Sequence, residues 1–164
     1  MALAFWMAFA FIISVYAGYP ALVWACARCR RPLQLAPAPD QWPGVSVIVP
    51  FCNEPERIAP KLETGRQQSY LGPLQIIFVA DGADDATAET VVGLQSHDVT
   101  AVVLPQRSGK PSALNAGVEQ AQHQLIFFTD ARQQLESNVI EVLVRRCVEE
   151  DVAAVSGELV LLGD

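Results

Sequence analysis

The N-terminal stretch from Ala2 to Ala27 lacks charged residues, and this absence is the strongest compositional signal in the chain. As a helix it would be about 39 Å long, more than the ~30 Å of a bilayer's hydrocarbon core. A cleaved signal peptide would carry a basic segment before a shorter apolar one, and a buried core helix would have a polar face. We therefore predict a transmembrane helix over residues 1–27.

Basic residues follow this stretch at once, at Arg28, Arg30 and Arg31. Cytoplasmic flanks of membrane helices are enriched in Lys and Arg. The pattern predicts a single-pass protein of the inner or plasma membrane whose globular part faces the cytoplasm. Residues 28–44 form a basic and Pro-rich linker, and residues 45–164 form the globular domain. The lipid bilayer is the first expected partner.

Positive charge is scarce in the chain as a whole, which has 11 Lys and Arg against 18 Asp and Glu and a net charge of −7. This balance argues against a nucleic-acid-binding protein, because such proteins present basic faces to phosphates. Zinc ligands are scarce too. Cys26 and Cys29 have the spacing of half a zinc site, but no second Cys or His pair completes it. We expect free thiols in a reducing compartment.

The globular domain has no internal repeat and alternates apolar strand-like runs with helical segments. Strands are predicted at Val45–Val49, Leu74–Ala80, Val99–Leu104 and Leu125–Thr129, with a further strand or pair at Val152–Ser156 and Leu159–Leu162. Helices are predicted at Glu56–Ser69, Thr87–Ser96, Pro111–Ala121 and Asn138–Glu150. At the start of the last, Asn138 followed by Glu141 is close to a capping box. Apolar strands separated by helices predict an α/β fold with a mainly parallel sheet covered on both faces.

Three of the predicted strands end abruptly in polar or acidic residues. Asn53 and Glu54 follow the first, Asp81 follows the second, and Asp130 follows the fourth. Ligands of open α/β sheets bind outside the carboxyl ends of the strands. We therefore expect residues 81, 110 and 130 to converge on one cleft for a charged, nucleotide-like ligand.

The acidic segment after the second strand allows two interpretations. A carboxylate at a strand end can accept hydrogen bonds from a base or a ribose hydroxyl, and we assign that function to Asp81. Alternatively, acids at the start of a helix interact favourably with its dipole and its free N–H groups. That capping interpretation is favoured for Asp84 and Asp85, and Thr87 fits it as well.

A glycine and a lysine, Gly109 and Lys110, stand just before a predicted helix. Free amides and the helix dipole make such a position suitable for phosphate. The segment is not a Walker A loop, because Pro111 follows the lysine in place of Ser or Thr. Taken alone, an ordinary exposed turn would explain it as well.

Asp130 at the end of the fourth strand is of the residue type that holds a divalent cation bridging two phosphates. The alternatives are a helix cap or an ion pair with Arg132. Exposed ion pairs contribute only ~0–1 kcal/mol, so stability gives little reason for one here.

These segments together resemble family 2 glycosyltransferases. The resemblance lies in Val45–Glu54, in Asp81 and Gly82 with Asp85 and Thr87, in Gly109 and Lys110 with Ala113–Asn115 and Gly117, and in Phe128–Asp130. It spans residues 45–164. It implies a GT-A fold and an inverting enzyme of polysaccharide biosynthesis that transfers sugar from a nucleotide diphosphate sugar, with a UDP-sugar as the expected donor, to an acceptor hydroxyl.

The resemblance also implies roles for single residues. The residues that border the nucleotide pocket are Pro50, Asn53 and Glu54. Asp81 would contact the base and Lys110 would approach the pyrophosphate. Asp130 would be the first acid of the family's D-x-D motif, which holds Mg²⁺ or Mn²⁺.

The sequence departs from the family pattern in three ways. Ala80 stands where many members have another Asp, and Arg132 stands where the second D-x-D acid usually is, which puts metal chelation in doubt. Our hypothesis is that Arg132 binds the leaving diphosphate itself. The third departure is that no general base is identifiable, since no motif assigns Asp151 or Glu158 to that role.

For this reason the sequence predicts a C-terminally incomplete donor-binding part of a longer enzyme. The alternative is a non-catalytic nucleotide-sugar-binding module whose partner chain supplies the acceptor half. A receiver-like regulator is a weaker alternative, because a receiver has clustered acids after its first strand and Glu54 is the only candidate at that place. The sugar, the acceptor and the oligomeric state are not predicted.

Overall fold

The computed structural model describes residues 2–29, 35, 37–83, 86–148 and 152–160. The chain divides into two compact units, Met1–Gln34 and Leu35–Asp164. The first contains the charge-free N-terminal stretch, and the second contains the predicted globular domain.

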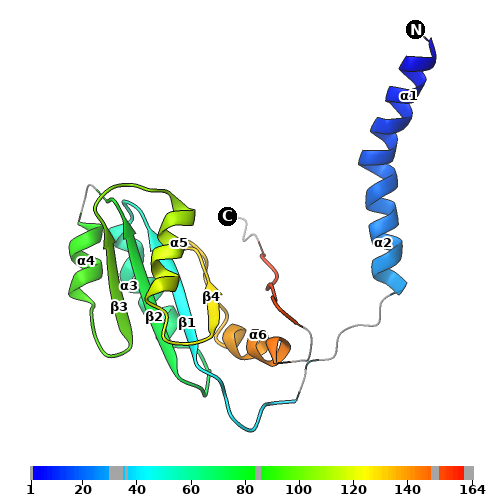
Figure 1. The fold of residues 1–164 in the computed structure, drawn as a ribbon. Coiled ribbons are helices and arrows are strands. Elements are labelled where there is room, and N and C mark those ends of the chain that lie inside the picture. Colours follow the sequence, from blue (N-terminus) through cyan, green and yellow to red (C-terminus); the bar gives the residue numbers. More distant parts are fainter. Residues whose placement is uncertain (1, 30–34, 36, 84–85, 149–151, 161–164) are drawn as a thin grey trace. The chain divides into compact units, whose positions relative to one another are not determined.

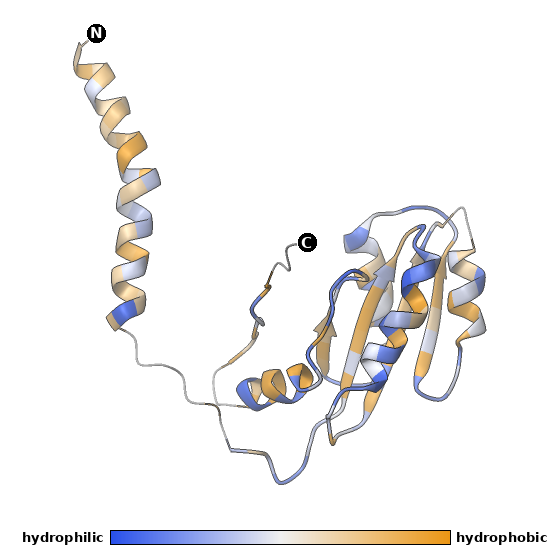
Figure 2. Ribbon diagram, turned by 180° about the vertical axis from the view of Figure 1, so that it is seen from behind, coloured by the Kyte–Doolittle hydropathy of each residue, from blue (hydrophilic) through white to orange (hydrophobic). Residues whose placement is uncertain are grey.

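The first unit is one long helix, Ala2–Cys29, of 28 residues and mean hydropathy 1.8, none of it buried. Its length and composition suffice to cross a membrane, and Figure 2 shows apolar residues along it. The helix comprises α1 (Ala2–Ile13), a π turn, η1 (Ser14–Gly18), and α2 (Tyr19–Cys29). In the π turn the N–H of Tyr19 donates to Ser14 O. Pro20 offers a reason for this wider turn, because it has no N–H and its ring would clash with the carbonyl four residues back.

The second unit is built on a four-stranded sheet in the order β3-β2-β1-β4 (Figure 1). Its strands are β1 (Val45–Phe51), β2 (Leu74–Asp81), β3 (Val99–Leu104) and β4 (Leu125–Phe128). All three pairings are parallel, so all the carboxyl ends lie at the same edge. The observed sheet confirms the predicted α/β fold class.

Helices cover both faces of the sheet, as the continuous apolar strands require. They are α3 (Pro55–Arg66), α4 (Thr87–Gly93), α5 (Lys110–Glu119) and α6 (Val139–Cys147). On one face Ile48, Ile77 and Val79 form a core with Ala113 of α5. On the other, the remaining inward residues of the strands form a larger core with side chains from α3, α4 and α6.

A glycine brings α5 unusually close to the sheet. A Cβ on Gly117 would lie 2.5 Å from Ile48 Cγ2, well inside normal contact. This close packing holds α5 against β1 and β2. Because α5 follows β3 and runs back across the sheet, its first residue, Lys110, lies at the edge where the parallel strands end (Figure 1).

The predicted C-terminal strand is wrong where the structure describes it. Residues 152–160 have no regular secondary structure, and residues 161 and 162 lie outside the described part. An apolar run becomes a strand only when a neighbouring strand pairs with its backbone. The β4 edge of the sheet gains no partner from residues 152–160.

Two predicted helix caps also fail. Asn138 precedes α6, but its side chain makes no cap hydrogen bond. Its ψ of 7° lies outside the extended region from which a capping side chain reaches the N–H groups of the first turn. Thr87 is buried, and its hydroxyl accepts the Glu54 N–H at 3.2 Å, so it fastens the β1–α3 loop. The caps proposed for Asp84 and Asp85 lie outside the described residues.

Candidate functional site

The candidate site lies at the carboxyl edge of the sheet, where the predicted residues follow β1, β2 and β4. Pro50 is the penultimate residue of β1 and is half-buried. Asn53 follows in the left-handed region with φ 53°, the only non-glycine residue among those described with positive φ. This turn leads directly into Glu54, the residue before α3.

Asp81 is the last residue of β2 and is only 4% exposed. Its two carboxylate oxygens accept the backbone N–H groups of Ser108, at 2.7 Å, and Gly109, at 2.9 Å. Charge-assisted bonds of this kind are among the stronger hydrogen bonds in proteins. Asp81 therefore fixes the loop that leads into Lys110, while its predicted contact with a nucleotide base stays a prediction.

Gly82 lets this loop approach the end of β2. It adopts φ 54°, and a Cβ there would lie 1.9 Å from the backbone nitrogen of Arg107. Only glycine fits this combination of a left-handed backbone and direct backbone contact. The Asp81–Gly82 pair thus has a structural reason: the acid binds the loop, and the glycine makes room for it.

Lys110 and Asp130 meet across the edge. Lys110 Nζ lies 2.7 Å from Asp130 Oδ2, and Asp130 Oδ1 accepts the Arg132 N–H at 3.2 Å. The hydrogen bond from Lys110 is the largest cause of a lowered pKa at Asp130, partly opposed by desolvation. Asp130 is therefore an ionised carboxylate already engaged on both oxygens.

Arg132 extends this arrangement to the first strand. Its Nε lies 2.7 Å from Glu54 Oε1, and this contact is the main reason for its raised pKa. Arg57 approaches the same Glu54 oxygen at 3.4 Å. The Arg132 side chain is 72% exposed, whereas Glu54 is 17% exposed. The guanidinium therefore stands in solvent above a more sheltered carboxylate.

The structure brings most of the predicted site residues together. Direct contacts join Lys110 to Asp130 and Arg132 to Glu54, while Asp130 and Arg132 lie two residues apart on one turn. Asp81 reaches this group through the loop before Lys110. Pro50 and Asn53 belong to the segment that ends at Glu54. Residues 81, 110 and 130 thus lie at one edge of the sheet. The buried Asp81 carboxylate does not line the hollow that Lys110 and Asp130 share, so convergence of all three on one cleft stays a prediction.

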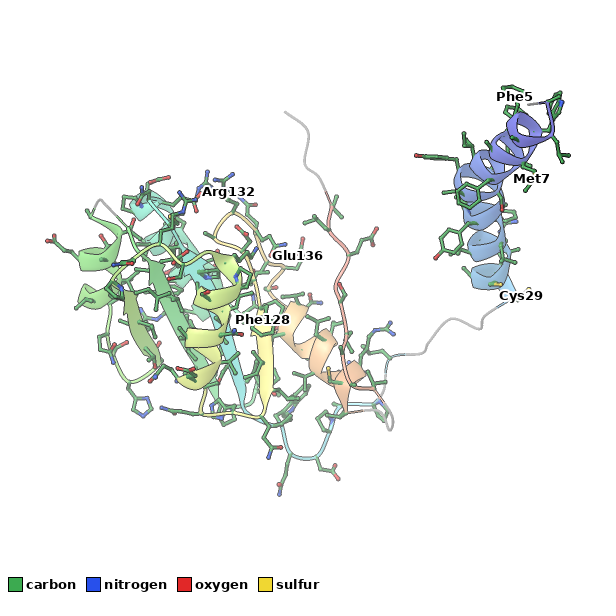
Figure 3. The ribbon with its side chains drawn as sticks, turned by 45° about the horizontal axis from the view of Figure 1, so that its top comes forward. Phe5, Met7, Cys29, Phe128, Arg132 and Glu136 are labelled. Atoms are coloured by element: carbon green, nitrogen blue, oxygen red, sulfur yellow. The ribbon has the colours of Figure 1, made fainter. Side chains whose placement is uncertain are left out.

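A hollow of about 1030 Å³ opens beside this group. Lys110, Asp130 and Arg132 line one part of it, and Phe128 lines another. Figure 3 labels Phe128, Arg132 and Glu136, which lie along β4 and the turn that follows it. The hollow has room for a ligand far larger than an inorganic ion.

The residues at Asp130 do not match a divalent-cation site. Hard cations need several oxygen ligands, usually including more than one carboxylate. Here one carboxylate stands between the ammonium of Lys110 and the turn of Arg132, and Glu54 is paired with two arginines. In the described ranges no three acid, His or Cys side chains cluster closely enough to hold a metal.

Sequence reasoning missed Lys61, which contacts the Asp130 turn from α3. Its Nζ donates to Thr129 Oγ1 at 2.9 Å and to Gln133 O at 2.7 Å. A signal for it exists in the sequence. The buried residues of α3 are Ile58, Lys61, Leu62 and Gly65, so the lysine occupies a position of the apolar helix face.

Comparisons with known proteins agree with this arrangement. Residues 46–161 match the family model described as Glycosyl transferase family 2. An N-acetylglucosaminyltransferase of Rhizobium sp. (strain N33) is 29% identical over 165 residues, which cover 92% of this chain and 34% of the relative. A poly-beta-1,6-N-acetyl-D-glucosamine synthase of Staphylococcus epidermidis (strain ATCC 35984 / DSM 28319 / BCRC 17069 / CCUG 31568 / BM 3577 / RP62A) is 31% identical over 103 residues, which cover 62% of this chain and 25% of the relative.

Solved structures show the same architecture. The mannosyltransferase PcManGT from Pyrobaculum calidifontis, in complex with GDP-Man and Mn²⁺, superposes with a TM-score of 0.73 and 28% identity over 87% of this chain and 44% of that one. The S. aureus TarS 1-349 structure in complex with UDP gives a TM-score of 0.53 at 23% identity, over 60% of this chain and 30% of that one. The chain spans about a third of the length of the first curated relative. By its match over residues 46–161 and its fold, the chain belongs to glycosyltransferase family 2 and has the GT-A architecture.

Proposed function

We propose that this chain is the donor-binding part of a membrane-anchored, inverting glycosyltransferase. It binds a nucleotide diphosphate sugar, with a UDP-sugar as the first expectation, at the carboxyl edge of the sheet. The sugar then passes to an acceptor hydroxyl in the synthesis of a glycan. The family, the curated relatives that transfer N-acetylglucosamine, and the nucleotide-bound structural relatives support this proposal.

The observation that carries the proposal is the row of paired charges along that edge. Lys110 pairs with Asp130, and Arg132, on the same turn as Asp130, pairs with Glu54. These residues lie beside a hollow large enough for a nucleotide sugar. Such exposed ion pairs add little to stability. A diphosphate can replace the carboxylates as the partner of Lys110 and Arg132, since guanidinium groups match phosphate oxygens well.

The reaction is a direct displacement. The acceptor oxygen bonds to the anomeric carbon while the bond from that carbon to the diphosphate breaks, leaving its electron pair on the diphosphate. Lys110 and Arg132 stabilise the charge that develops there. The acceptor proton passes to a general base, which we assign to no residue of this chain.

Arg132 occupies the position of the second metal-binding acid, and we propose that its guanidinium does part of the work of a cation at the diphosphate. The structural relative from Pyrobaculum calidifontis was solved with Mn²⁺. In the present chain the Asp130 carboxylate is paired with Lys110 and lies near the positive charge of Arg132, so it is a poor ligand for a metal cation. We therefore derive no step that passes through a metal.

We further propose that the helix Ala2–Cys29 anchors the protein in the inner or plasma membrane. Its length and hydropathy support the anchor. Arg28, Arg30 and Arg31 support an orientation in which the globular part faces the cytoplasm. Nucleotide sugars would then reach the site from the cytoplasmic side.

Calorimetric titration of the full chain in detergent tests the proposed function. UDP, GDP and their sugars are titrated with and without Mn²⁺, and at least one nucleotide should bind. Asp81→Ala should abolish that binding, because the Ser108–Gly109 loop loses its acceptor. Asp98→Ala is the matched control, since Asp98 pairs with Arg66 and lies just before β3, at the other end of the strands. Unaltered affinity in Asp81→Ala would contradict the proposed pocket.

The second candidate is a non-catalytic nucleotide-sugar-binding module that works with a partner chain. The paired charges at the carboxyl edge support it too, because donor binding there requires no general base. Sugar transfer measured with the chain alone, and again after a C-terminal half of a relative is added in trans, separates the two. Transfer that appears only with the added half, and only when this chain is present, supports the module.

A further inference from the structure

Two charged side chains are buried among the described residues of the globular unit, Lys61 and Asp81, at 5% and 4% exposure. Asp81 binds the backbone of Ser108 and Gly109 and so fixes the loop before Lys110. Lys61 stands in the same relation to the other loop of the site. Its contacts lie on Thr129 and Gln133, on either side of Asp130 and Arg132.

The turn after β4 is held from several directions. The Gln133 side-chain oxygen accepts the Asp130 N–H at 2.9 Å and the Thr129 hydroxyl at 3.1 Å. The Gln133 N–H donates to Asp130 O at 3.2 Å, and the Thr129 N–H donates to Ile48 O of β1 at 3.2 Å. Lys61 adds two side-chain hydrogen bonds from α3 to this turn, and they tie its first residue to its last.

Stability does not explain a lysine at this position. Burial lowers the pKa of Lys61 to about 8, with the nearby Asp130 charge opposing the shift. Both acceptors that it contacts are neutral oxygens, so no ion pair in direct contact offsets the desolvation. An apolar side chain of similar length would fill the same position of the helix face without that cost.

We propose that Lys61 is a positioning residue for the diphosphate-binding turn: from α3 it binds Thr129 and Gln133 and so fixes where Asp130 and Arg132 stand. This inference rests on the proposed function for its role in donor binding. Lys61 itself need not touch the nucleotide. It acts on affinity through the placement of Arg132 and Asp130.

Lys61→Met in the full chain tests the proposal with two measurements. The first is amide hydrogen exchange of residues 129–133 without ligand, which should become faster as the turn loses its anchor. The second is calorimetric affinity for UDP and GDP, which should fall about tenfold or more, the scale of one hydrogen bond to a charged group. Arg66→Met is the control. It also removes a cation from α3, but the partner of that cation is Asp98.

A double-mutant cycle separates positioning from a general loss of structure. In an Arg132→Ala background, Lys61→Met should change nucleotide affinity much less than it does in the wild type, because the group that it positions is gone. Equal losses in both backgrounds would overturn the proposal, and so would unchanged exchange in the turn. If Lys61→Met does not fold, Thr129→Val removes one of the same contacts from the other side and should show the same pattern more weakly.

Failure of the proposed function gives a different result. A wild-type chain that binds no nucleotide contradicts donor binding and, with it, the donor-binding part of this inference. The exchange measurement still decides whether Lys61 holds the turn. Faster exchange limited to residues 129–133 supports that contact, and unchanged exchange refutes it.

Discussion

Arg132 gives the turn after β4 a positive side chain next to the Asp130 carboxylate. The D-x-D pattern would place two carboxylates on the turn after β4, whereas this chain places one carboxylate and one guanidinium there. The arginine also reaches Glu54, so it joins the loop after β1 to the loop after β4. In our proposal, a guanidinium that can bind phosphate directly stands where the D-x-D pattern has its second acid.

Arg132→Asp should exchange one mode of binding for the other. The variant loses the guanidinium, so its affinity for UDP or GDP without metal should fall about tenfold or more. It gains a second carboxylate beside Asp130, so Mn²⁺ should restore part of that affinity. Calorimetry in EDTA and in Mn²⁺ measures both effects. Arg66→Asp is the control, and identical metal dependence of wild type and Arg132→Asp would contradict the role of Arg132.

Lys61 makes a prediction about pH. Its folded pKa of about 8 lies below its ordinary 10.5, so between these values the unfolded chain binds more protons than the folded one. The free energy of unfolding contributed by Lys61 should therefore rise from about pH 8 to 10.5. Urea unfolding of wild type and Lys61→Met, followed by circular dichroism from pH 7 to 10.5, measures the difference between them. A constant difference would contradict the shift.

The comparison with Lys61→Met matters because other groups oppose this trend. Burial raises the pKa of Tyr70 to about 12 and also raises the pKa of Cys147. Each of these groups loses its proton at a higher pH in the folded state than in the unfolded state. Between its two pKa values each group therefore lowers the free energy of unfolding as the pH rises. Their contributions are common to both proteins and cancel in the difference.

Among the secondary-structure elements, α5 depends most clearly on a small residue. In Gly117→Ala the new Cβ would be too close to Ile48 and Val79, which should destabilise the globular unit by about 1–3 kcal/mol. The better helix propensity of alanine should offset up to ~1 kcal/mol of that loss. Gly93→Ala is a matched control, since a Cβ there meets nothing within 4 Å. It should be neutral or slightly stabilising. Chemical denaturation of the two variants should separate them, and equal midpoints would contradict the tight packing of α5.

The regular elements of the globular unit followed from local patterns in the sequence. The apolar runs at Val45, Leu74, Val99 and Leu125 each became a parallel strand. The two central strands, β1 and β2, are buried nearly throughout, whereas β3 and β4 at the edges are mostly half-buried. The acid or amide groups at their ends then fell on one edge, since parallel strands end together. The order of the strands and the family resemblance together placed Lys110 near Asp130, a contact that the structure shows.

What the sequence did not reveal depends on contacts between distant residues. Thr87 looked like a helix cap, but its hydroxyl binds Glu54, 33 positions away. The C-terminal apolar run needed a pairing strand that the described residues do not provide. Lys61 stands on the apolar stripe of α3, and only the fold shows that its amine meets the turn after β4. Local propensity cannot show which distant groups will satisfy a side chain.

At the scale of the whole molecule, the net charge of −7 and the local cations of the site serve different purposes. The overall acidity disfavours polyanions such as nucleic acids. The site concentrates Lys110, Arg132 and Arg57 within reach of two carboxylates, so one small diphosphate can find paired donors there. Under the proposed function, this contrast would favour a small anion over a polymeric one.

The N-terminal helix should determine where the protein resides. Val15 lies near the middle of the helix Ala2–Cys29, and an arginine at the centre of a membrane helix costs about 2.5–3.5 kcal/mol on insertion. Val15→Arg should therefore shift the chain from the membrane to the soluble or aggregated fraction after alkaline extraction of membranes. Val15→Leu is the control and should stay in the membrane. A wild-type chain released by alkali would contradict the anchor.

The proposed orientation rests on the arginines at and just after the end of this helix, and a reporter at the C-terminus of the full chain measures it. Alkaline phosphatase is active only outside the cytoplasm, so its fusion to the wild-type chain should be inactive, while a fluorescent-protein fusion should fluoresce. Replacing Arg28, Arg30 and Arg31 with alanine removes the positive flank and should raise phosphatase activity, because orientation depends on that bias. High phosphatase activity of the wild-type fusion would place the site away from cytoplasmic nucleotide sugars, and the proposed donor could not reach it.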